Sequence, residues 1–214
     1  MENRYLGYYT DAGAYYYYHT EEGMNYDETF QHIRQHLDKT EWPVRFSQYD
    51  SWFYPHGEGN GLKHWEFLTD EKNFPRGGEA AFIDHHLPLV AHNRWFGPDN
   101  LYAVQNGGDY NFVIENNTID LPIGPPGSGV GPYALPNDTS FWDDFLANRR
   151  QWGLMTYEQD WMDKQVNRME WTQQVAGVAA NNLYQMNHGA EIAGIDVQYC
   201  MSTPRIALTS LEVR

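Results

Sequence analysis

The chain has 214 residues, enough for one domain with a sizeable hydrophobic core. Its formal net charge is −15, from 14 basic and 29 acidic residues, and no run of Lys or Arg occurs. Because phosphate backbones and anionic membranes are bound through clustered basic residues, we expect neither as a partner. No stretch of about 18 apolar residues predicts a transmembrane helix, and the N-terminus does not resemble a signal peptide. Compartment and oligomeric state stay open.

Aromatic residues are abundant, at 16% of the chain with 16 Tyr and 8 Trp. Rings with polar tips serve both as core residues and as platforms on which sugars stack. The single cysteine, Cys200, has no partner for an internal disulfide, and a buried, inert thiol is the expected state for it.

The first elements alternate between strand and helix. Residues 5–9 predict a strand, followed by a loop and by the tyrosine run 15–18. Residues 25–40 carry apolar side chains at helical spacing, with Asn25 or Asp27 as the N-cap. A second strand is predicted over 44–55, closed by the acidic and aromatic residues Asp50 and Trp52.

The middle of the chain is richer in loops. Residues 56–78 are punctuated by Gly and Pro, a short helix is predicted over 77–86, and 87–96 reads as a buried strand. Residues 97–139 predict a long loop insertion, with an extra strand at 112–115 and irregular chain at 123–132. Such long loops are usually functional or flexible.

The last third resumes the alternation. Ser140 is the predicted cap of a helix that continues to Trp152, with Gly153 as the residue that ends it. Residues 153–158 predict a strand ending in acids, 162–188 a long helical region, 195–201 a strand, and Pro204 the start of another helix.

This alternation predicts an α/β fold with parallel strands, in a single domain over 1–214. Polar side chains follow every predicted strand, and in both barrels and open sheets this edge holds the active site. No nucleotide-binding glycine motif is present, so no cofactor is expected. The residues at or just beyond the C-terminal ends of the strands are Asp11, Asp50, His92, Arg94, Asp160, Tyr199 and Cys200.

Several segments resemble clan D glycoside hydrolases, the α-galactosidases and α-N-acetylgalactosaminidases. WEFLTDEKNFPRGGEAAFIDHHLPLVAHNRW resembles the stretch that leads into the third barrel strand, and FSQYDSWFY resembles the second strand. YEQDW resembles the fourth strand, which ends Lys-x-Asp, and IDVQYCM the fifth. The resemblance covers roughly residues 5–205. It implies a (β/α)8 TIM-barrel type of fold, incomplete after about five parallel strands.

The resemblance also implies retaining hydrolysis of α-linked sugars, with Asp160 as the nucleophile. The general acid/base of the family follows its sixth strand and is therefore expected beyond Arg214. Two positions depart from the family pattern: Glu158 stands where Lys is usual, and Asp50-Ser51-Trp52 replaces Asp-Asp-Gly-Trp. The expected substrate-binding residues are Asp11, Asp50, Trp52, His92, Arg94, Trp95, Glu158, Trp161, Tyr199 and Cys200.

Alternatives stay open at this point. Asp160 also fits a helix cap, and Trp52, Trp95 and Trp161 also fit core positions. The chain also fits a non-catalytic carbohydrate-binding barrel or an inert fragment. A metal-dependent hydrolase would use His85, His86 and His92 with Asp84 or Asp50, although neighbouring His85 and His86 cannot both face one site on a helix. No metal site is predicted.

Overall fold

A central sheet of five parallel strands organises the computed structural model, which describes residues 4–116 and 131–209. The strand order β1-β2-β3-β6-β7 follows the chain, so each new strand is added at the same edge. This confirms the predicted α/β class and the number of parallel strands. The five strands are β1 (Leu6–Tyr9), β2 (Val44–Tyr49), β3 (Leu89–Asn93), β6 (Leu154–Gln159) and β7 (Asp196–Tyr199).

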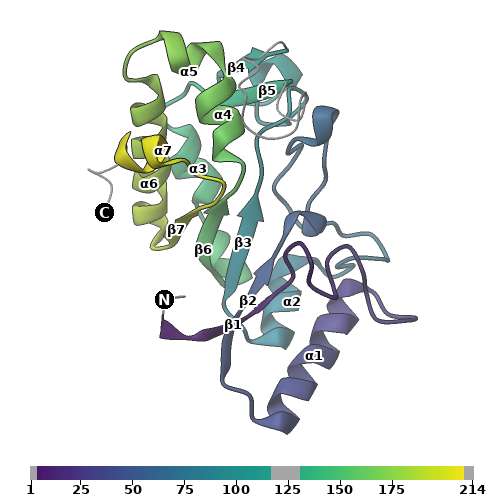
Figure 1. Cartoon of the computed structure of the whole chain (residues 1–214). Helices are drawn as coiled ribbons and strands as arrows, with labels where there is room; N and C mark the ends of the chain where they lie inside the picture. Colours follow the sequence, from purple (N-terminus) through teal and green to yellow (C-terminus); the bar gives the residue numbers. More distant parts are fainter. Residues whose placement is uncertain (1–3, 117–130, 210–214) are drawn as a thin grey trace.

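Helices connect the strands, and a small hairpin lies apart from the sheet. Figure 1 shows α1 and α2 beside the first three strands, and α3 and α6 beside the last two. The antiparallel pair β4 (Phe112–Glu115) and β5 (Tyr133–Pro136) lies beyond the end of β3, within the predicted insertion 97–139. The helices are α1 (Tyr26–Thr40), α2 (Gly77–His85), α3 (Phe141–Leu146), α4 (Met162–Arg168), α5 (Glu170–Gln174), α6 (Val178–Ala193) and α7 (Pro204–Thr209). Short 3₁₀ turns are η2 (Ser51–Phe53), η3 (Glu58–Asn60), η4 (Val104–Asn106) and η5 (Arg149–Trp152).

The two faces of the sheet differ in chemistry. Successive residues of a strand point to opposite faces. Tyr49, Ala91 and Tyr157 belong to the large hydrophobic core, whereas the register that pairs Ala91 with Tyr157 also pairs His92 with Glu158 on the other face. The alternation therefore places polar side chains of the strands together, away from the core.

Aromatic rings make up much of this core. The rings of Tyr26 on α1 and Trp52 stack at a centroid distance of 3.8 Å, and Phe30 and Tyr49 pack around them. A second group joins α3 to the sheet: Trp142 and Phe145 contact Tyr157 of β6. The high aromatic content is thus used first for packing.

Most predicted elements are present, with corrected ends. Asn25 is the N-cap of α1: its side chain accepts from the Glu28 backbone N–H, and the Glu28 carboxylate accepts from the Asn25 backbone N–H. The second and third strands end at Tyr49 and Asn93, earlier than predicted. The extra strand is β4, and most of 123–132 lies outside the described residues.

One helical prediction is wrong, and one predicted helical region is divided by two breaks. The helix predicted from Ser140 to Trp152 is split into α3 and η5, and Ser140 makes no capping bond to α3; its hydroxyl donates instead to Asp138. The region 162–188 is three helices, because Met169 adopts an extended conformation (φ −75°, ψ 131°) and Gly177 has φ 83°. Gly153 does end a helical turn, with φ 76°, but that turn is η5.

Candidate functional site

A group of polar side chains gathers where the parallel strands have their carboxyl ends, and we call this end of the sheet the polar edge. Its members are Thr10, Gln48, Asp50, His92, Glu158 and Asp160. Asp160 follows β6 directly, and its side chain is 14% exposed. Nε2 of His92, from β3, lies 3.1 Å from Asp160 Oδ2. The Cys200 thiol, after β7, donates a hydrogen bond to the same carboxylate. Three of the five strand ends therefore meet at Asp160.

His92 links this carboxylate to a buried tyrosine. The Tyr54 hydroxyl lies 2.8 Å from His92 Nδ1, and the two rings are nearly parallel. His92 thus contacts the Asp160 carboxylate through Nε2 and the Tyr54 hydroxyl through Nδ1, so both ring nitrogens have a partner. His92 and Tyr54 are almost completely buried, and this chain of bonds fixes the orientation of Asp160.

The surroundings of Asp160 favour its ionised form. Burial raises its pKa, but the hydrogen bond and the charge of His92, with the hydrogen bonds from Cys200 and from the Trp161 N–H (2.6 Å to Oδ1), outweigh burial, so the pKa lies below its usual value. The hydrogen bond from the Trp161 N–H joins neighbouring residues, and the N-cap position of α4 is occupied by Trp161, with φ 56°. Asp160 therefore accepts one N–H near the start of the helix without being its N-cap.

Glu158 lies two residues before Asp160, within β6, and its environment is different. It is 3% exposed, lies opposite His92 in the strand register, and accepts a hydrogen bond of 3.0 Å from Gln48 Nε2. Burial raises the pKa of Glu158 despite the hydrogen bond, and the charges of Asp50 and Asp160 raise it further. Carboxyl groups whose environments push their pKa values apart are typical of acid and base pairs in enzymes.

Gln48 and Thr10 complete the network toward the first strand. The Thr10 N–H donates to Gln48 Oε1, and the Thr10 hydroxyl donates to the Gln48 carbonyl at 2.7 Å. Asp50 accepts from the N–H and hydroxyl of Ser51. The Asp11 side chain is near Asp50: burial first, and then the charge of Asp50, raise the Asp11 pKa. The acids predicted after β1 and β2 therefore do lie near each other.

The other predicted site residues are placed less uniformly. Trp52 is 3% exposed and lies in the core against Tyr26, with its N–H donating to Thr10. Tyr199 accepts a hydrogen bond from Asn187 of α6, on the helical side of the sheet. These two side chains are not brought to the polar edge. Burial raises the pKa of the Cys200 thiol, as does the nearby Asp160 carboxylate.

Arg94, Trp95 and Trp161 form a separate cationic and aromatic cluster with Lys164 of α4. The Trp95 and Trp161 rings meet edge to face at 5.7 Å, and Lys164 Nζ lies over both. The Arg94 guanidinium lies over Trp95 and donates to the Asn60 carbonyl. This cluster begins directly after β3 and β6, so it borders the carboxylate edge.

Sequence reasoning missed Gln48, Tyr54 and Thr10. Gln48 was open to prediction, because it lies two residues before Asp50 on one strand and must share its face. Tyr54 carried no such signal, since it lies in a loop whose path only the fold determines.

The histidines considered for a metal site do not gather. His85 is buried on α2, whereas His86 is exposed and ends that helix with φ 54°. Across residues 4–116 and 131–209, no group of three or more His, Cys, Asp or Glu side chains is arranged to hold a metal ion. In the same part of the chain, no helix is long and apolar enough to cross a membrane.

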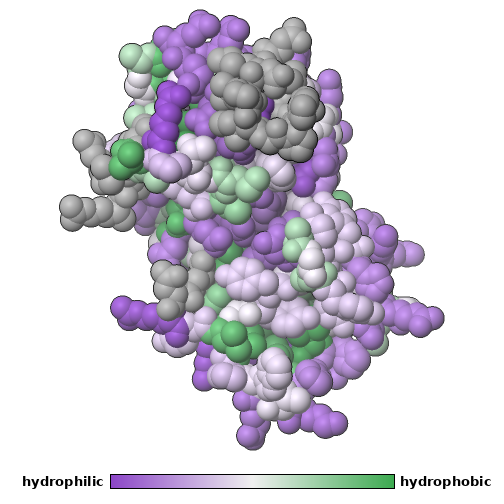
Figure 2. Space-filling model, in the orientation of Figure 1, coloured by the Kyte–Doolittle hydropathy of each residue, from purple (hydrophilic) through white to green (hydrophobic). Residues whose placement is uncertain are grey.

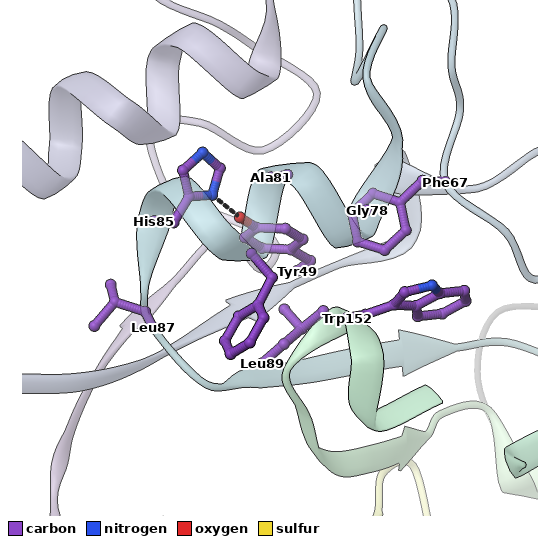
Figure 3. Close-up of a pocket in the computed structure, with 9 residues that line it drawn as sticks. Tyr49, Phe67, Gly78, Ala81, His85, Leu87, Leu89 and Trp152 are labelled. Atoms are coloured by element: carbon purple, nitrogen blue, oxygen red, sulfur yellow. Dashed lines mark hydrogen bonds between the residues drawn. The ribbon is translucent and has the colours of Figure 1, made fainter. Parts of the chain in front are cut away.

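A small cavity exists elsewhere, between α2 and the sheet. Figure 3 shows it lined by apolar side chains, with His85 Nδ1 3.0 Å from the Tyr49 hydroxyl at its wall. Tyr49 and Leu89 point to the helical face of the sheet, opposite to His92 and Glu158. The cavity is therefore a gap in core packing and does not belong to the polar edge.

Comparison with known proteins gives similarity in structure alone. No protein-family model matches the sequence, and no curated protein matches it. Many solved structures resemble the fold, and three of them illustrate the similarity. A family 27 β-L-arabinopyranosidase from Geobacillus stearothermophilus, in complex with arabinose, has a TM-score of 0.59 and 11% identity, over 97% of this chain and 51% of that one.

The other two have TM-scores of 0.54 and 13% identity. A family 36 α-galactosidase from G. stearothermophilus, in complex with raffinose, covers 92% of this chain and 28% of its own. A putative α-N-acetylgalactosaminidase from Bacillus halodurans covers 91% of this chain and 48% of its own. The fold is thus similar to that of clan D glycosidases, as the sequence motifs predicted. The chain spans about half or less of each of these proteins.

Proposed function

We propose that the polar edge of the sheet binds a neutral sugar and belongs to a retaining α-glycosidase of the clan D type, with Asp160 as the nucleophile. The supporting observation is the placement of Asp160: it follows the fourth parallel strand, is partly accessible, and is held ionised by three hydrogen bonds. The proposal includes a β/α barrel to which these five strands contribute.

The chemistry asked of Asp160 matches its surroundings. In a retaining mechanism an ionised carboxylate attacks the anomeric carbon, the glycosidic bond breaks, and a covalent glycosyl ester forms. A protonated acid gives its proton to the leaving oxygen and later takes one from the water that hydrolyses the ester. Orientation by His92 and Tyr54 leaves Asp160 little freedom to turn away from the sugar.

The remaining acids have binding roles in this proposal. Asp11 and Asp50 accept hydrogen bonds from sugar hydroxyls, and Arg94, Trp95 and Trp161 border the sugar. Glu158 lies deepest and contacts a hydroxyl at the base of the site. The general acid/base is assigned, from the family resemblance, to a position after a sixth strand and to no residue described here.

A second candidate is sugar binding without hydrolysis. The observation that favours it is Glu158, which places a carboxyl group where the family has a Lys. With Glu158 at this position, the cation of the family is missing and a second carboxyl group lies near Asp160. The two carboxylates repel each other, since the charge of Asp160 raises the pKa of Glu158.

Kinetics with a nitrophenyl α-galactoside separate the two. Asp160→Asn should lower the rate by about a thousandfold or more, because loss of a nucleophile removes the covalent route. Galactose binding, measured by calorimetry, should persist. The matched control is Asp163→Asn, the same change in the first turn of α4, which should keep activity. Unchanged turnover in Asp160→Asn would exclude the nucleophile role, and galactose binding without any covalent glycosyl adduct at Asp160 would favour the second candidate.

A further inference from the structure

The loop between β1 and α1 carries four consecutive tyrosines that the proposed reaction does not use. Tyr15 is 71% exposed and Tyr18 is 51% exposed, and their rings form edge-to-face pairs with Tyr16 and Tyr17. Figure 2 shows the surface in the region of this loop as largely pale, the colour of residues in the middle of the hydropathy scale. Large rings with polar tips are thus presented to solvent as a group.

Hydrogen bonds hold the loop against the candidate site. The Tyr18 hydroxyl lies 3.0 Å from Ser51 Oγ, and the Ser51 hydroxyl in turn donates to the Asp50 carboxylate at 2.8 Å. On the other side, the Tyr26 hydroxyl of α1 donates to the Tyr16 carbonyl, and the Tyr16 hydroxyl donates to Glu21. The Tyr18 ring and the loop backbone at Tyr16 are therefore held in place, while the Tyr15 ring packs edge to face on Tyr16 and His19. Less rotamer freedom is then lost when a ligand binds.

A line of rings runs from the tyrosines to Asp160. The Tyr18 and His56 rings meet edge to face with their centroids 6.4 Å apart, and the His56 and Tyr54 rings do so with their centroids 5.2 Å apart. Tyr54 is the hydrogen-bond partner of His92, which holds Asp160. Burial, followed by the charge of Arg94, lowers the pKa of His56 to about 4, so its ring is neutral at physiological pH. The tyrosine loop therefore borders the residues that hold Asp160, with Tyr17 and Tyr18 near Asp50 and Arg94.

Charge restricts what this surface takes. Asp11, Asp50 and Glu21 lie around the loop, Arg94 is a cation near Tyr17 and Tyr18, and the whole chain carries −15, so acidic groups predominate. A sulfated, phosphorylated or carboxylated glycan would meet like charge. Neutral pyranose rings suit it, because their C–H faces pack on aromatic rings while their hydroxyls reach tyrosine hydroxyls and carboxylates.

We propose that Tyr15–Tyr18 form an aromatic platform that binds a second sugar unit of a neutral oligosaccharide whose first unit lies at Asp160. This inference rests on the proposed function for the position of the first unit. It names the substrate class as oligosaccharides rather than small glycosides.

The test uses the full chain with Asp160→Asn, which blocks turnover, and with carbon-13 labels in the tyrosine and histidine rings. It is titrated with galactose, melibiose, raffinose and stachyose, which contain one to four sugar units. The Tyr15 and Tyr18 signals should shift with the longer sugars and not with galactose. Affinity should rise by roughly tenfold along the series, the size expected for one or two aromatic contacts.

Three variants test the cause of that rise. Tyr15→Ala with Tyr18→Ala should remove the length dependence and leave galactose affinity unchanged. Tyr18→Phe should keep most of the rise in affinity with sugar length, because the ring is retained. Trp42→Ala is the control, since Trp42 is 62% exposed before the start of β2, at the other end of the strand.

Each outcome decides the platform by itself. If the Tyr15 and Tyr18 signals stay fixed with every sugar, or shift equally with galactose and stachyose, the platform is wrong. The His92 signal reports separately on the first unit. Shifts at the tyrosines without a shift at His92 would keep the platform and overturn the proposed site at Asp160.

Discussion

At the scale of single residues, Asp160 and Glu158 show how one strand supports two carboxyl groups of opposite character. Glu158 lies on β6 and Asp160 directly follows that strand, yet the pKa of Asp160 is lowered and that of Glu158 is raised. The difference comes from donors: Asp160 accepts three hydrogen bonds, whereas Glu158 is more deeply buried. His92 is the donor that can be tested without knowing the substrate.

Replacing His92 should raise the pKa of Asp160. In His92→Phe the carboxylate loses a hydrogen bond while burial, which raises the pKa, remains. A carboxyl whose folded pKa is depressed adds stability above its unfolded pKa and loses it as the pH falls through the folded pKa. In the variant that loss should therefore begin at higher pH. Carboxyl carbon-13 titration measures the pKa directly.

Asp27 is the internal control for this titration. Its pKa is also lowered: burial opposes the shift, but hydrogen bonds from His85 and Arg76 outweigh it, far from His92 in the core around α1. The pKa of Asp27 should be the same in the unaltered protein and in His92→Phe. An Asp160 pKa that does not move in His92→Phe would show that the Cys200 and Trp161 donors suffice.

Part of this site follows from the sequence and part does not. Residues after parallel strands must meet at one edge, which is why Asp50, His92 and Asp160 were predictable. Tyr54 and Trp52 were not, because both lie in the chain after β2, where no periodicity applies. Trp52 turns into the core and Tyr54 turns toward His92, and only the packed fold decides between those directions.

At the scale of elements, Trp52 of η2 packs on α1, beside the direct contacts of Phe30 with Tyr8 of β1 and Tyr49 of β2. Its ring stacks on Tyr26 at 3.8 Å and packs on Phe30 and Phe74. Trp52→Ala should lower the free energy of unfolding by about 3–5 kcal/mol, the usual range for a buried aromatic ring. Trp42→Ala, at an exposed position, should change it by no more than about 0.5 kcal/mol. Urea denaturation compares the two, and equal effects would contradict the packing described.

Helix ends show the limit of local prediction. The capping box of Asn25 and Glu28 is a sequence signal, and α1 begins where it predicts. The break before α5 has no such signal: the Glu115 carboxylate, from β4, accepts the N–H groups of Glu170 and Trp171. A cap supplied 55 residues away cannot be read from the local pattern.

At the scale of the whole molecule, the five strands form a sheet with β1 and β7 as its outer strands. Residues on β1 are well exposed, with Leu6 at 51% and Tyr9 at 42%. In the barrel that we propose, further strands would pair with these edges. The similar glycosidases are about twice as long as this chain or longer, so this proposal is consistent with their size.

Covalent trapping tests the central claim most directly. An activated α-galactosyl fluoride, with a second fluorine that slows hydrolysis of the ester, needs no protein acid to release its leaving group. Mass spectrometry of the treated chain should show one glycosyl adduct on the peptide that contains Asp160. The adduct should be absent in Asp160→Asn and present in Asp163→Asn. An adduct on another residue, or none in a chain that binds galactose, would contradict Asp160 as the nucleophile.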